Sequence, residues 1–79
     1  MNWDEYINSK GKRTWDSYTS DGNLLRIVQE DGDVEQYNVK VFHHISSKGL
    51  IGQDQVTSFS EAESVCTKIV EFNKLAKTV

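Results

Sequence analysis

The sequence predicts an α+β domain in which a three- to four-stranded antiparallel meander sheet carries a C-terminal helix packed on one face. Two Asp-Gly steps, Asp21-Gly22 and Asp31-Gly32, lie ten residues apart within strand-like sequence, and Asp-Gly between β-rich runs is the strongest short-range hairpin signal. A long amphipathic segment follows them and opens with helix-capping residues. With a short N-terminal helix, the expected order is α-β-β-β-(β)-α, and a chain of 79 residues is expected to form a single domain, 1–79.

The N-terminal segment 2–10 is expected to be the short helix. Asn2 is placed to cap it, with Glu5 three residues on as in a capping box, and Gly11 stands where a glycine commonly ends a helix. Because aromatic and β-branched residues also favour strands, an edge strand is the alternative for this segment. In the expected helix, one face would carry the apolar and aromatic side chains of Trp3, Tyr6 and Ile7.

Three strands are expected next, over residues 13–19, 23–29 and 34–44. The third has the clearest pattern, since apolar and polar residues alternate along it. Residues 45–57 are rich in Ser, Gly and Gln, and a short fourth strand near 53–57 is an option there.

The second hairpin needs a loop with an odd number of residues. Only an odd length puts the apolar residues of both strands on one face, because a one-residue slip turns a whole strand over. We predict the three-residue loop Glu30-Asp31-Gly32, with Gly32 in the left-handed conformation of a G1 bulge, which pairs Leu25 with Tyr37. The residues brought to one face are Leu25, Ile27, Tyr37 and Val39.

The last helix is expected to begin with Ser60 as its cap and Glu63 as the partner in a capping box. The alternative is a helix that begins at Ser58 with Glu61 as the box partner. Apolar residues then recur at three- and four-residue steps, which is typical of a helix with one buried face. The core should join the sheet and helix residues Leu25, Ile27, Tyr37, Val39, Val41, Val65, Ile69, Phe72 and Ala76.

The expected element order is similar to that of double-stranded RNA-binding domains. The resemblance is limited to the order, because the basic cluster that opens the last helix of that family is replaced here by Ser60-Glu61-Ala62-Glu63. We therefore do not assign the chain to that family.

Composition excludes several classes of function. Nine Lys and Arg against twelve Asp and Glu give a net charge of −3, so a bulk electrostatic attraction to nucleic acid is absent. No stretch approaches the roughly 18 apolar residues of a membrane span. The single cysteine cannot form an internal disulfide, and with no signal peptide this favours the cytoplasm.

No constellation of residues indicates catalysis, a cofactor or a metal site. His43 and His44 are neighbours on a strand and point to opposite faces, so they cannot chelate one ion together. Cys66 lies within the apolar stripe of the last helix, where a buried structural thiol is expected. We therefore expect a protein that is not an enzyme, with no catalytic residue, cofactor or metal ligand.

The strongest functional indication is acidic surface. Between Asp16 and Gln36 there are six acids and one base, a local charge of −5. Solvated turns that protect strand edges explain such acids equally well. The functional interpretation is a surface that docks on a basic partner protein, with exposed aromatics beside it. The candidate partner-binding residues are Asp16, Asp21, Glu30, Asp31, Asp33, Glu35, Trp15 and Tyr18.

We therefore expect a small acidic protein-binding module, monomeric or homodimeric, that acts as an inhibitor or adaptor by occupying a partner's surface. Proteins of phages and mobile elements that block host machinery belong to this class. The alternative is weak nucleic-acid binding by the basic link at 10–13 together with tryptophan stacking. Its candidate residues are Lys10, Lys12, Arg13, Lys40, Trp3 and Trp15.

Overall fold

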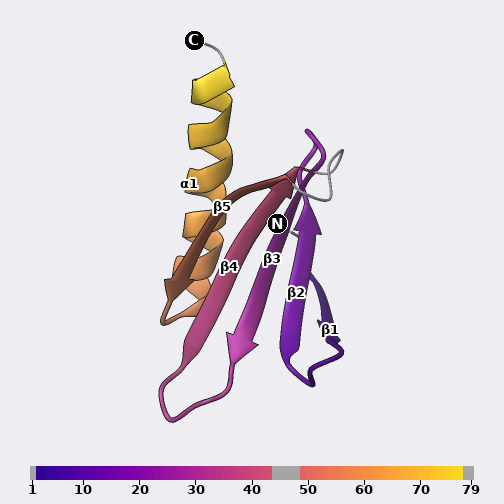
Figure 1. Cartoon of the computed structure of the whole chain (residues 1–79), viewed down its shortest axis with the longest axis vertical. Coiled ribbons are helices and arrows are strands. Elements are labelled where there is room, and N and C mark those ends of the chain that lie inside the picture. The colour runs from indigo at the N-terminus through magenta and orange to yellow at the C-terminus, as the bar shows by residue number, and fades with distance from the viewer. Residues whose placement is uncertain (1, 44–48, 78–79) are drawn as a thin grey trace.

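The structure, a computed structural model, describes residues 2–43 and 49–77, the last three by their backbone alone. Five strands form one antiparallel meander, in the order of the chain, and a single helix follows them (Figure 1). This confirms the α+β class, whereas the expected count of three to four strands is wrong. The elements are β1 (Asp4–Ile7), β2 (Arg13–Tyr18), β3 (Asn23–Glu30), β4 (Gln36–His43), β5 (Leu50–Val56) and α1 (Phe59–Lys77).

The N-terminal segment forms the edge strand β1, so the predicted N-terminal helix is wrong and the alternative holds. Gly11 has φ of 77°, and its N–H donates to the Asn8 carbonyl at 2.9 Å. The Asn8 N–H donates to the Lys12 carbonyl at 2.9 Å, which closes a three-residue loop of the G1-bulge kind. The left-handed glycine therefore serves a hairpin. With β1 in place of the helix, the element order no longer follows that of double-stranded RNA-binding domains.

The β2–β3 connection uses the same kind of loop. Gly22 has φ of 85° and donates to the Thr19 carbonyl at 3.0 Å, and Thr19 donates to the Asn23 carbonyl at 3.0 Å. Both loops read Ser-x-Gly between their closing residues. The Asp-Gly signal at 21–22 thus marks a tight hairpin, as the sequence indicates.

The β3–β4 connection is longer than predicted. Glu30 pairs with Gln36, which leaves the five residues Asp31–Glu35 outside the ladder, and Leu25 pairs with Val41 instead of Tyr37. Gly32 has φ of 155°, far from the value of about +57° that a G1 bulge requires. The three-residue loop is wrong, but the odd length is right, and the predicted faces are therefore confirmed.

The C-terminal half also departs from the expected boundaries. β5 spans Leu50–Val56, earlier and longer than the short strand expected near 53–57. The helix begins at Phe59, and the Ser58 Oγ accepts a hydrogen bond from the Glu61 N–H at 3.1 Å. Ser58, not Ser60, is the N-cap.

The core lies between α1 and strands β3–β5, and no helix of the described residues lies on the other face of the sheet (Figure 1). All five predicted sheet residues are buried, from Leu25 to Val41. On the helix, Val65 and Ile69 are only partly buried, Phe72 is 76% exposed, and the Ala76 side chain lies outside the described residues. Placing Phe72 in the core is therefore wrong.

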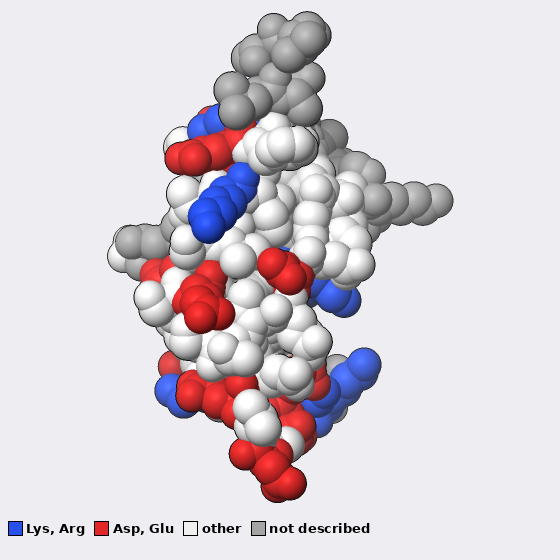
Figure 2. Space-filling view, turned by 90° about the vertical axis from the view of Figure 1, so that its left-hand side faces the viewer, with Lys and Arg blue, Asp and Glu red and all other residues white. Residues whose placement is uncertain are grey.

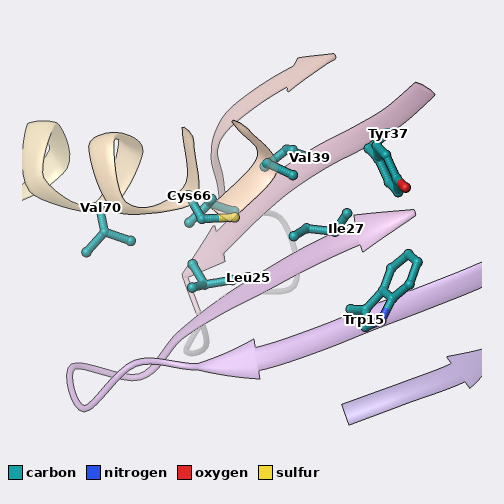
Figure 3. Packing of buried hydrophobic residues seen from close by; sticks show 9 residues of the cluster. Trp15, Leu25, Ile27, Tyr37, Val39, Cys66 and Val70 are labelled. Carbon is teal, nitrogen blue, oxygen red and sulfur yellow. The ribbon is translucent and has the colours of Figure 1, made fainter. Parts of the chain in front are cut away.

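The helix residues that are fully part of the core are Ala62, Cys66 and Val70, and Phe59, Val65 and Ile69 pack against them while only partly buried. Figure 3 shows Cys66 pointing from α1 toward β3 and β4, near Ile27 and Val39. Besides the five sheet residues and Cys66, the buried apolar residues are Trp15 of β2 and Ala62 and Val70 of α1.

Candidate functional site

Ion pairs neutralise three of the six acids of the predicted acidic surface. Asp16 lies on the helix-free face of β2, directly opposite Arg26 of β3. The Arg26 guanidinium donates to both carboxylate oxygens, at 2.8 and 3.0 Å, and Tyr6 Oη donates to the same carboxylate at 2.9 Å. The Asp16 side chain is 13% exposed, so its charge is neutralised and largely withdrawn from solvent. The pair in turn raises the pKa of Arg26, chiefly through the hydrogen bond.

Glu30 and Asp21 are also held by bases. The Glu30 carboxylate accepts hydrogen bonds from Lys12 and Asn38, and the Lys12 bond is the main cause that lowers the pKa of Glu30. Asp21, in the β2–β3 loop, lies 2.9 Å from the Lys74 ammonium of α1. The side chains of Asp21 and Lys74 are each about half exposed, and an ion pair between such exposed groups stabilises the fold by at most about 1 kcal/mol.

Trp15 lies in the core and is 8% exposed, so its ring is not part of the accessible surface. Its Nε1 donates to Glu5 Oε1 at 3.1 Å, and its ring centroid lies 4.9 Å from that of Phe59. The Arg13 guanidinium lies 5.0 Å from the centroid of the Trp15 ring and is paired with Glu5. Of the two predicted aromatics, only Tyr18 is exposed, at 66%.

Three predicted acids remain together in the β3–β4 connection, Asp31–Glu35, which we call the acidic tip. All five of its residues are exposed, and Val34 among them is 67% exposed. Among the described residues the structure records no ion pair for any of its three acids. Figure 2 shows acidic atoms gathered at the end of the molecule where Figure 1 places this connection.

The acidic tip is anchored at one end by the side chain of Tyr37 of β4. The Glu35 carboxylate accepts a hydrogen bond from Tyr37 Oη, and this bond is the main cause that raises the pKa of Tyr37. Tyr37 is itself buried against Trp15 and Phe59. Glu35, at one end of the acidic tip, is therefore tied to the core through Tyr37.

Most basic residues of the alternative function lie on the helix-free face. A depression of about 370 Å³ there is lined by Lys10, Lys12, Arg26 and Lys40, with Glu30 as the acid among them. Two of these bases are already held, Lys12 by Glu30 and Arg26 by Asp16. The tryptophans are on the opposite side of the sheet, where both contact Phe59. The structure does not bring the lysines and the tryptophans together.

The histidines and the cysteine form no cluster in the described part of the chain. No group of three possible metal ligands occurs there, and His44 lies outside the described residues. Burial, helped by the charge of Glu63, raises the pKa of the Cys66 thiol to about 12, which keeps it protonated at neutral pH. No described helix has the length and apolar character needed to cross a membrane.

Sequence reasoning missed a groove between α1 and β5. It encloses about 550 Å³ and is lined by Ile51, Gln53, Asp54, Val65, Lys68, Ile69, Phe72 and Asn73. The side of the molecule that carries α1 and β5 faces the viewer in Figure 2, and charged side chains are sparse over its middle. The only sequence signal was Phe72 at the edge of an unusually broad apolar stripe.

Comparisons of the chain with protein-family models, with curated proteins and with solved structures gave no match.

Proposed function

We propose that this chain is a non-enzymatic protein-binding module that docks its acidic tip on a basic surface of a partner protein. One observation carries the proposal. Of the six acids between Asp16 and Gln36, the three outside the acidic tip are each held by a base, whereas the three within it have no recorded ion pair with any described residue. Within this segment, the negative charge available to a partner is therefore concentrated in the acidic tip.

The geometry of the acidic tip suits electrostatic docking. Exposed charges of one sign attract a complementary surface over about 10 Å at 0.1 M salt, and they act mainly on the association rate. Val34 supplies an apolar side chain among the acids, and apolar contact gives a complex its residence time once the charges have oriented it.

By covering a basic surface of its partner, such a module blocks other molecules that bind there, or it connects the partner to another protein. We therefore propose an inhibitor or adaptor acting in the cytoplasm, of the kind that phages and mobile elements direct against host machinery. A lone cysteine such as Cys66 is compatible with a reducing compartment.

Charge reversal of the acidic tip tests the proposal. The variant Asp31→Lys/Asp33→Lys keeps Gly32 and alters only exposed side chains, so the fold should survive. The matched control is Asp4→Lys/Glu71→Lys, which makes the same change in net charge at exposed positions of β1 and α1. Wild type and both variants are used to capture proteins from a host lysate, with quantitative mass spectrometry.

We expect one protein to be captured by wild type and control and lost by the acidic-tip variant. With that protein purified, its association rate constant should fall at least about tenfold for the acidic-tip variant and become less dependent on salt. Equal capture by wild type and the acidic-tip variant would reject the acidic tip as the docking surface.

Nucleic-acid binding is the second candidate, and one observation favours it. Lys10 and Lys40 are exposed, line the same depression and have no recorded ion pair in the described structure. Fluorescence anisotropy with a labelled single-stranded DNA and a labelled duplex RNA distinguishes the two functions. If wild type and the acidic-tip variant bind either probe and Lys10→Glu/Lys40→Glu does not, nucleic-acid binding replaces the first proposal.

A further inference from the structure

The outer edge of β5 is the less protected edge of the sheet. β5 ends the strand order, and no described strand pairs with its other side. At the opposite edge, β1 is four residues long and carries the acids Asp4 and Glu5. β5 is seven residues long and has Asp54 as its one charged residue, without lysine or proline. Natural sheets normally shorten or charge a free edge to prevent pairing, so an unprotected edge of this length indicates a surface that pairs.

Apolar side chains continue from this edge onto α1. Phe72 is 76% exposed in the groove between α1 and β5, beside the partly buried Val65 and Ile69. Ile51 and Leu50 supply apolar surface from β5 itself. A phenylalanine held in solvent beside an unpaired strand gains from being covered together with that strand.

We propose that a second copy of this chain covers the groove. The two β5 strands pair antiparallel across a two-fold axis and join the two five-stranded sheets into one. The two α1 helices then lie side by side on the same face of the joined sheet, and Phe72 of each copy enters the groove of the other.

The charges of the groove are self-complementary. Its lining includes one acid, Asp54, and one base, Lys68. A surface with a single sign of charge would repel its own copy, whereas one charge of each sign can form two equivalent ion pairs across a two-fold axis. This balance favours a second copy over a strongly charged partner.

The same charges select the register. A two-fold axis at Asp54 would set two carboxylates directly opposite each other, which is unfavourable. An axis at Gln53 instead sets Asp54 opposite Gly52 of the second copy, which carries no charge and no side chain of its own. Gly52 lies against Ile69, the neighbour of Lys68 in the chain, so this register brings Asp54 toward Lys68 of the second copy.

Sedimentation velocity over about 1–100 µM, spanning micromolar affinities, tests the dimer with the full chain. Wild type should sediment as a dimer at the higher concentrations, and Phe72→Glu should raise the dissociation constant by about 30-fold or more, as loss of a central aromatic anchor does. Val34→Glu is the matched control, because Val34 is 67% exposed but lies in the acidic tip; it should dimerise like wild type. A monomeric wild type at 100 µM, or an unchanged Phe72→Glu, would overturn the dimer and leave the groove to another partner.

A charge swap tests the arrangement within the dimer. Asp54→Lys alone and Lys68→Glu alone should each be monomeric, because each puts like charges together at the interface. An equal mixture of the two variants should dimerise, since every pair across that interface is again of opposite sign. A mixture that stays monomeric, or single variants that dimerise like wild type, would overturn the proposed pairing.

A cysteine scan tests the register in the Cys66→Ala background, which removes the native thiol. Gln53→Cys should form a disulfide-linked dimer under mild oxidation, because residue 53 of each copy faces its equivalent across the axis. Gln55→Cys should not, because its equivalent lies farther along the strand. Cross-linking at 55 and not at 53 would reject this register.

Discussion

Gly52 of β5 lies so close to Ile69 of α1 that a side chain on residue 52 has no room. A Cβ added there would be 2.5 Å from Ile69 Cγ2 and 3.1 Å from its Cγ1 and Cδ1. Gly52 does not have a positive φ, unlike Gly11 and Gly22, so space rather than conformation requires glycine at this position. The absent side chain allows the helix to pack down on the edge of the sheet, which also shapes the groove beside it.

Gly52→Ala should therefore lower the free energy of unfolding by about 1–3 kcal/mol, as overpacking does. The same substitution in an Ile69→Ala background should cost much less, because the clashing atoms are gone. Urea unfolding of the four proteins at one protein concentration gives the coupling energy. Strictly additive effects would contradict the contact.

Ile27→Ala should destabilise the domain by about 2–5 kcal/mol, because Ile27 is fully buried between β3 and the helix. Ile7 offers a matched control for the same chemical change, since it is 65% exposed at the end of β1. Ile7→Ala should change stability by no more than about 0.5 kcal/mol. Comparable losses at both sites in urea unfolding would mean that β1 packs differently from the structure.

Ser58→Ala should cost about 1 kcal/mol, because it removes the side chain that accepts the Glu61 N–H at the start of α1. Ser60 lies within the first turn and is exposed, so Ser60→Ala should be close to neutral. Thermal or urea unfolding distinguishes the two serines. A loss at Ser60 with none at Ser58 would restore the boundary expected from the sequence.

Stability should decline at alkaline pH through Cys66. Burial raises the pKa of its thiol from 9.0 to about 12, so between these values the unfolded chain releases a proton that the folded chain keeps. The contribution is complete below pH 9 and is lost toward pH 12, at about 1.4 kcal/mol per pH unit. Urea unfolding from pH 7, below that interval, to about pH 10.5, inside it, should show a steeper decline of stability above pH 9 for wild type than for Cys66→Ala. Parallel pH profiles would contradict a buried, neutral thiol.

Local patterns predicted which way side chains face, and they did so without the correct loop length. In β4 the alternation of apolar and polar residues puts Tyr37, Val39 and Val41 on the helix side, because strand side chains repeat every second residue. Any loop with an odd number of residues preserves that assignment. In the observed register Glu30 pairs with Gln36 and stays in the ladder, where its carboxylate is held by Lys12 from the β1–β2 connection. Local sequence carries no signal for that contact.

The candidate site was predictable only in part. The sequence showed where the acids are, but their charges are cancelled by bases from other elements, as Asp16 is by Arg26 and Asp21 by Lys74. Asp31 and Asp33 stay available because their connection projects beyond the ladder.

The sequence by itself determined the fold class, the existence of α1, the face of each central strand and the tight hairpin at Asp21-Gly22. Those features depend on neighbours within a few residues. Only the tertiary structure decided that residues 4–7 form a strand and that Phe72 faces a groove. These outcomes depend on contacts such as that of Trp3 Nε1 with Glu63 Oε2, 60 residues apart, and that of Gly52 with Ile69, which no local pattern encodes.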